Sequence, residues 1–202
     1  MMKRQKIASL SVRRELLERK ISFLTPREFQ RIFNSSSVRT KYFLETYTKQ
    51  GMFVRLKPGL YAFEGRMPSG EEIANALYQP SYLSFEYALA RHGIIPEIVY
   101  ALTSATTKPT RTFAAANLGF EYFTIKKQAF TGYGLVKDGR DRTQSVLIAE
   151  PEKAVADYLY FVSLGKRELN DRMTIKGLDR KKIIRYAELF ERPRLMHVIE
   201  IL

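Results

Sequence analysis

The sequence predicts an α+β fold, and three observations lead to this prediction. Amphipathic helical segments dominate residues 10–50. Segments typical of β-strands occur between residues 98 and 149, and a strongly apolar helical segment begins at residue 151. The pattern breaks at residues 65–69, so we expect two domains, residues 1–66 and residues 67–202.

The first two helices are indicated by different features. Residues 10–21 form an amphipathic segment with several charged side chains. Its apolar positions are Leu10, Val12, Leu16 and Leu17. A second helix should begin after Thr25, a preferred N-cap, because Pro26 fits the first helical position and Glu28 completes a capping box.

A third helix is expected over residues 36–50, and Gly51 suits its C-terminal end. Successive residues of a helix are separated by about 100°, so this segment divides into two faces. The side chains expected to pack inward are Thr40, Phe43, Leu44 and Tyr47. Those expected to face outward are Val38, Arg39, Tyr42, Thr46 and Lys49.

Two strand-like segments follow the third helix, at residues 52–56 and 60–63. Between them, Lys57-Pro58-Gly59-Leu60 fits a type II turn, because proline fixes one φ and glycine supplies a positive φ. Two short helices followed by such a hairpin are the order of a winged helix-turn-helix. We therefore expect residues 1–66 to be a DNA-binding domain of this type, followed by a mixed domain with an antiparallel-type sheet packed on helices.

Positive charge is concentrated in the same region. The chain has 34 Lys and Arg against 21 Asp and Glu, a net charge of +13. Residues 1–66 hold 15 basic and 5 acidic side chains, residues 67–162 are close to neutral, and residues 163–202 carry a smaller positive excess. Such clustering favours contact with nucleic-acid phosphates, and a basic protein without this partner is the alternative.

Seven side chains are expected to contact double-stranded DNA. They are Ser36, Arg39, Tyr42, Thr46, Lys49, Arg55 and Lys57. Those of the third helix would read or clamp the major groove, with Ser36 bonding a phosphate at the helix N-terminus. Arg55 and Lys57 would position the hairpin on the DNA backbone. The alternative for the third helix is a plain solvated face.

The second domain should combine helices and strands. Helices are expected after Ser69, from Ser84 to His92-Gly93, from Pro151 through Val162, and as a last pair after Asp179. Strands are expected over residues 98–103, 112–116, 120–126 and 145–149, with turns between them that include Asp138-Gly139.

Catalytic and metal-binding chemistry has little support in the sequence. The chain has no cysteine, which excludes thiolate zinc sites, and its two histidines, His92 and His197, are expected to be structural. The best acidic cluster consists of Glu150, Glu152 and Asp157 beside Lys153. It leaves a Mg²⁺-dependent nuclease open, although a glutamate at a helix N-terminus also fits a structural role. We expect no enzyme activity, no cofactor and no metal.

The compartment follows from the same composition. The longest apolar runs, such as residues 99–102 and 146–149, are far too short to span a bilayer. The basic start of the chain lacks the apolar region of a signal peptide. Together with the lack of cysteine, this predicts a cytoplasmic protein without a membrane partner.

Two motifs of the second domain resemble the AbiEi family of antitoxins. In residues 82–94, Ala88-Leu89 precedes His92-Gly93, as in that family. The strand ending at Ala149 and the following Glu150-Pro151-Glu152-Lys153-Ala154 are similar to its alanine-x-proline-glutamate-lysine-alanine stretch. Lys57-Pro58-Gly59-Leu60-Tyr61 also fits the family's N-terminal domain, so the resemblance covers about residues 23–165.

The resemblance implies a transcriptional autorepressor that is also the antitoxin of a type IV toxin–antitoxin, abortive-infection system. Its winged helix would bind inverted repeats in its own promoter. Its second domain would counteract a nucleotidyltransferase toxin without forming a stable complex. The alternative is a protein-interaction or toxin-neutralising module in which DNA binding is incidental.

Overall fold

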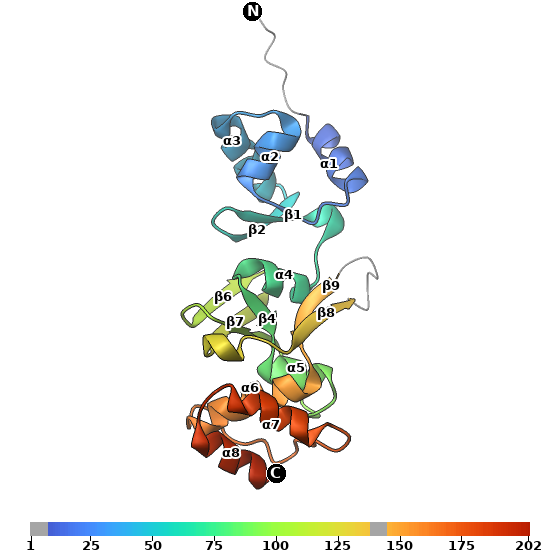
Figure 1. Ribbon diagram of the computed structural model, residues 1–202. Helices are drawn as coiled ribbons and strands as arrows, with labels where there is room; N and C mark the ends of the chain where they lie inside the picture. The colour runs from blue at the N-terminus through green and yellow to red at the C-terminus, as the bar shows by residue number, and fades with distance from the viewer. Residues whose placement is uncertain (1–7, 138–144) are drawn as a thin grey trace, which may run out of the picture. The chain divides into compact units, whose positions relative to one another are not determined.

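A computed structural model describes residues 8–137 and 145–202 of the chain. It contains eight α-helices and two sheets within these residues, so the α+β class is confirmed (Figure 1). The chain divides into two compact units, Met1–Ser69 and Gly70–Leu202, whereas the sequence predicts a boundary after residue 66. The predicted turn at Asp138-Gly139 lies outside the described residues.

The first unit combines three helices with a small antiparallel sheet. In chain order its elements are α1 (Ser9–Glu18), β1 (Phe23–Leu24), α2 (Pro26–Phe33), α3 (Ser37–Lys49), β2 (Phe53–Lys57), β3 (Leu60–Phe63) and the 3₁₀ helix η1 (Glu64–Arg66). The strand order is β1-β3-β2. The helices and the β2–β3 hairpin follow one another as the sequence predicts, and β1 is an unpredicted addition that pairs with β3.

The start of α2 is fixed by local hydrogen bonds. The Oγ1 atom of Thr25 accepts from the backbone N–H of Glu28 at 3.2 Å, and the Glu28 carboxylate accepts from the backbone N–H of Thr25 at 2.8 Å. This is the predicted capping box, and Pro26 occupies the start of the helix. It positions Phe29, which is fully buried in the core.

The core of the first unit is built mainly from aromatic and leucine side chains. Its buried members are Val12, Leu16, Leu24, Phe29, Phe43, Leu44, Phe53, Tyr61 and Phe63. Two positions of the predicted apolar stripe of α1 are not part of it, because Leu10 is 80% exposed and Leu17 is 45% exposed. Only Val12 and Leu16, one turn apart, reach the core from α1.

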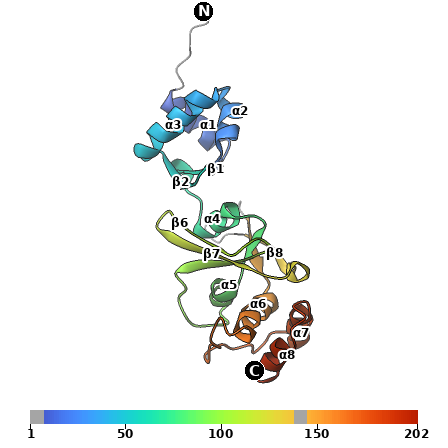
Figure 2. The same ribbon diagram turned by 90° about the vertical axis from the view of Figure 1, so that its left-hand side faces the viewer.

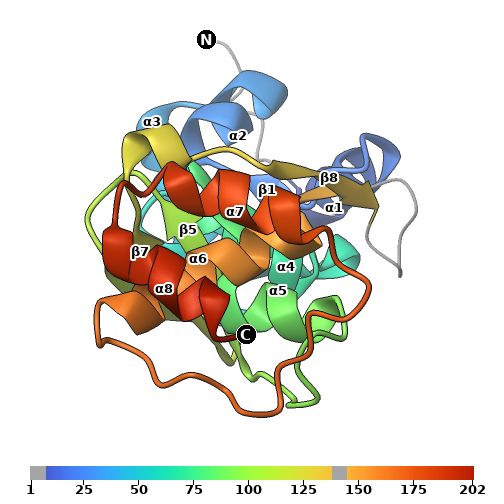
Figure 3. The same ribbon diagram turned by 60° about the horizontal axis from the view of Figure 1, so that its bottom comes forward.

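The second unit has a six-stranded sheet with helices on both faces. Its elements are α4 (Gly70–Leu77), β4 (Ser81–Leu83), α5 (Phe85–Arg91), β5 (Ala101–Thr106), β6 (Arg111–Ala115), β7 (Leu118–Thr124), η2 (Lys127–Ala129), β8 (Tyr133–Lys137), β9 (Ser145–Ala149), α6 (Pro151–Ser163), α7 (Arg180–Glu188) and α8 (Pro193–Glu200). Figure 2 shows α4 on one face and α5 and α6 on the other. The helices α7 and α8 pack on α6 and form a further layer (Figure 3).

The sheet of the second unit is mixed, which corrects the prediction of an antiparallel-type sheet. The strand order is β6-β7-β5-β4-β9-β8. The β5–β7 and β4–β9 pairs are parallel, and the other pairs are antiparallel. The β6–β7 hairpin folds back so that β7, not β6, lies beside β5. A pattern of short strands and turns reveals hairpins, but not such pairing between distant strands.

A buried ion pair connects α6 to the sheet. Lys153 and Asp157, one turn apart on α6, are both fully buried, and the Lys153 ammonium donates to Oδ1 of Asp157. The Oδ2 atom of Asp157 accepts from the hydroxyls of Tyr82 at 2.9 Å and Ser84 at 2.7 Å. The ammonium of Lys153 also lies 4.8 Å from the centre of the Phe190 ring. These contacts connect α6 to Tyr82 on β4 and to Ser84 just after that strand. They also connect it to Phe190, which follows α7.

Burial acts against both charges of this pair. It raises the pKa of the Asp157 carboxyl and lowers the pKa of the Lys153 ammonium, and their mutual attraction opposes these shifts. Two charges removed from water need each other and further hydrogen bonds to be stable. Here the carboxylate has three donors, so removal of either partner would leave an uncompensated buried charge.

We predict that Asp157→Asn or Lys153→Met lowers the free energy of opening of α6 by about 3–5 kcal/mol. The double change Lys153→Met with Asp157→Leu should cost less than the sum of the two single changes, because no lone charge remains. Hydrogen exchange of the α6 amides in the full chain measures this free energy.

The matched control is Lys182→Met, which removes only the partly exposed ion pairs of Lys182 with Glu150 and Glu152. It should change the exchange of α6 much less, because exposed pairs contribute little. Unchanged exchange in both buried single variants would show that the network does not stabilise α6.

Candidate nucleic-acid interface

Helix α3 buries one of its faces and exposes the other. Thr40, Phe43 and Leu44 are buried, and the Phe43 ring lies 5.0 Å from that of Phe29 on α2. Tyr47 is partly buried and packs on Phe43, with 4.2 Å between the ring centres. The predicted inward face of the third helix is thus confirmed, and both α2 and β2 pack against α3.

The predicted outward face is also found on the surface. Arg39, Tyr42 and Lys49 are exposed, and Thr46 is partly exposed. Within residues 8–137 and 145–202, neither Arg39 nor Lys49 forms an ion pair with a carboxylate. Both cations can therefore approach a phosphate or a base edge without first breaking such a pair.

Ser36 has a structural role that is compatible with the predicted one. It is the N-cap of α3, and its Oγ accepts from the backbone N–H of Arg39 at 3.5 Å. The side chain is exposed, and its hydroxyl proton can still be donated to a phosphate oxygen. The first turn of α3 also presents backbone N–H groups, which favour an anion.

The β2–β3 hairpin presents two further cations. Arg55 is exposed and Lys57 is partly exposed, near the turn between the strands. Gly59 has a φ of +81°, as the predicted type II turn requires at this position. Leu56 and Leu60, which lie beside these residues near the turn, are buried.

The charge of this surface is strongly one-sided. Residues 36–63 contain the basic side chains Arg39, Lys41, Lys49, Arg55 and Lys57 and one acidic side chain, Glu45. All seven predicted DNA-contacting residues are at least partly exposed on α3, its N-cap and the hairpin. Val38 and Lys41 are exposed on the same helix and are absent from the predicted set. Val38 was predicted to face outward but not to contact DNA, although it lies one helical turn before Tyr42 on the same face.

In the acidic cluster of the second unit, Asp157 has a different cationic partner from Glu150 and Glu152. Asp157 is fully buried and holds Lys153, whereas Glu150 and Glu152 bind Lys182 at 2.7 Å and 3.4 Å. The ion pair and the Tyr186 hydroxyl keep the pKa of Glu150 below its usual value. Among the described residues, no group of three or more His, Asp and Glu side chains is arranged to hold a metal ion.

The two histidines have different environments. Nε2 of His92 lies 2.8 Å from the backbone carbonyl oxygen of Ala149, which fits the predicted structural role. His197 is exposed on α8 and lies 3.7 Å from Glu200, so the prediction of a packed structural histidine is wrong there. The helix α8 buries Leu195 and Ile199, and His197 falls on its other side.

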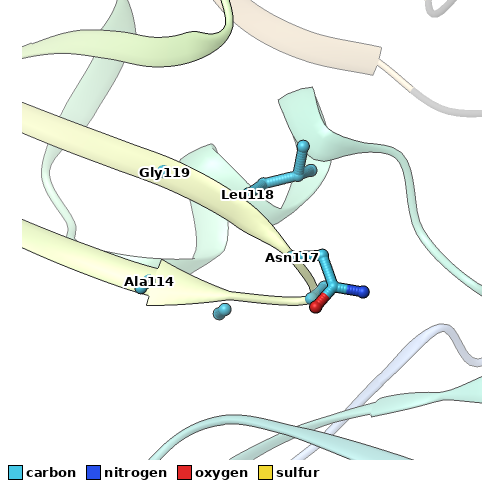
Figure 4. A pocket seen from close by; sticks show the side chains of 6 residues that line it. Ala114, Asn117, Leu118 and Gly119 are labelled. Carbon is cyan, nitrogen blue, oxygen red and sulfur yellow. The ribbon is translucent and has the colours of Figure 1, made fainter.

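A shallow hollow beside the β6–β7 hairpin has little chemistry to offer. It is lined by Ala114, Ala115, Ala116, Asn117, Leu118 and Gly119 (Figure 4). None of these side chains is titratable, and Asn117 at the turn is their one polar side chain. The exposed cationic surface of α3 and the hairpin therefore remains the better candidate for a functional site.

A search with models of known protein families gives no match for this chain, and a comparison with curated proteins gives none either. Among residues 8–137 and 145–202, no helix has both the length and the apolar character needed to cross a membrane.

Proposed function

We propose that the first unit is a winged helix-turn-helix that binds duplex DNA sequence-specifically, and that the protein represses its own promoter. The observation that carries this proposal is the exposed face of α3, which presents Arg39, Tyr42 and Lys49 while the opposite face of the helix is packed in the core. The N-terminal part of such a helix would enter the major groove. Arg55 and Lys57 on the hairpin would then hold the flanking phosphates.

A second candidate function is the neutralisation of a nucleotidyltransferase toxin by the second unit. The observation in its favour is that Gly70–Leu202 is a compact unit with its own six-stranded sheet and buried core, far more than a spacer requires. The resemblance to AbiEi antitoxins gives the same expectation. Under this proposal the protein is not an enzyme, needs no cofactor and acts in the cytoplasm.

Arg39→Ala should weaken specific binding by about 1–3 kcal/mol if Arg39 contacts a base. Gel shifts with the DNA upstream of the protein's own gene and with a scrambled duplex measure this effect. Arg194→Ala, which removes the same charge from an exposed position on α8, is the control and should bind like the unchanged protein. Equal affinity of the unchanged protein for both duplexes would refute sequence-specific binding.

Lys57→Ala should act differently, because a phosphate contact carries no sequence information. Binding to specific and scrambled duplexes should weaken to a similar degree, and the slope of log affinity against log salt concentration should fall by about one. Fluorescence anisotropy over a series of salt concentrations measures the slope. The control Lys176→Ala, exposed in the second unit, should leave it unchanged. An unchanged slope for Lys57→Ala would exclude this contact.

The two functions can be separated in the full chain. A variant with Arg39→Ala and Arg55→Ala should lose DNA binding and still rescue cells that express a nucleotidyltransferase encoded beside this gene. Growth after co-expression is the measurement, with an empty vector as the control. If DNA binding is lost and rescue is lost with it, neutralisation depends on the first unit and the second candidate function is wrong.

A further inference from the structure

Two exposed apolar side chains lie on the cationic face of α3. Val38 is 77% exposed and Tyr42 is 73% exposed. They are four residues apart, so they are neighbours on the helix surface in its first two turns. Single exposed apolar residues are common, but this pair lies within the stripe that carries Arg39 and Lys49. An occupant of this stripe must therefore offer both negative charge and small apolar groups.

The major groove of DNA offers this combination. Phosphates provide the negative charge, and among the groups that base pairs present there, the C5-methyl group of thymine is the apolar one. A valine near the N-terminus of a helix in the groove can cover such a methyl group, and a tyrosine ring one turn later can cover another. The single acidic residue of residues 36–63, Glu45, is exposed on the same face of the helix, one turn beyond Tyr42.

We propose that Val38 and Tyr42 read thymine through its methyl group, so that the recognised DNA carries thymines opposite the first two turns of α3. This inference rests on the proposed DNA-binding function. Arg39, next to Val38 in the chain, supplies a donor fork suited to guanine O6 and N7. The helix therefore selects a site in which thymine and guanine occur close together.

Removal of one methyl group from the DNA isolates this contact. The full chain is first used to select binding duplexes from a random pool, and each thymine of the selected site is then replaced by deoxyuracil. This replacement keeps every hydrogen-bonding group and every charge of the base. The affinity should fall about fourfold at each thymine that faces Val38 or Tyr42, because a buried methyl group contributes about 0.8 kcal/mol. Thymines outside the selected site should show no change.

Protein variants assign the contact to its residues. Val38→Ser should remove the thymine-to-uracil difference at one position and leave it at the other. Tyr42→Ala should do the reverse, whereas Tyr42→Phe, which keeps the ring, should behave as the unchanged protein. Val136→Ser is the matched control, because Val136 is 42% exposed on β8 of the second unit, and it should keep both differences. Circular dichroism verifies that each variant is folded.

The outcomes separate this inference from the proposed function. If a specific duplex is selected and deoxyuracil is tolerated at every position, the methyl contact is wrong and specific DNA binding stands. If the differences persist unchanged in both Val38→Ser and Tyr42→Ala, other residues read the thymines and the assignment is overturned. If no duplex is enriched over the starting pool, the proposed function fails and this inference fails with it.

Discussion

The packing of α3 on α2 is the constraint on which the candidate interface depends. Phe43 and Leu44 are buried, and Phe43 meets the fully buried Phe29. Because a helix is rigid, this contact determines which side chains remain outside. Arg39 and Tyr42 are exposed as a direct result. The capping box of Thr25 and Glu28 contributes indirectly to this exposure, because it fixes the start of α2, and α2 packs against α3.

The second unit depends on a different kind of interaction. Its helix α6 is largely buried between the sheet and the α7–α8 layer, and it carries a lysine and an aspartate at positions where apolar residues would be expected. Such a pair adds little stability compared with apolar packing, but its hydrogen bonds have direction. Tyr82 and Ser84 accordingly fix the position of α6 along the sheet.

Local signals made much of the fold predictable, and non-local pairing limited the rest. The capping box of Thr25 and the periodicity of α3 act within a few residues, and the sequence shows both. The strand β4 was missed because it consists of only three residues directly before a helix, and β8 was missed because Gly134 interrupts its apolar pattern. The exposed face of α3 could be predicted from helical periodicity. The exposure of Leu10 could not, because it depends on how far the core of the first unit extends along α1.

The full burial of Lys153 has a consequence for the chemical reactivity of the protein. Amine-selective reagents need a deprotonated and accessible nitrogen, and the ammonium of Lys153 is enclosed by Asp157 and the rings of Tyr82 and Phe190. Surface lysines such as Lys176 will be acylated while the fold is closed, and Lys153 will be spared. The rate of acylation at Lys153 therefore reports how often α6 separates from the sheet, and this rate can be measured on the unmodified protein.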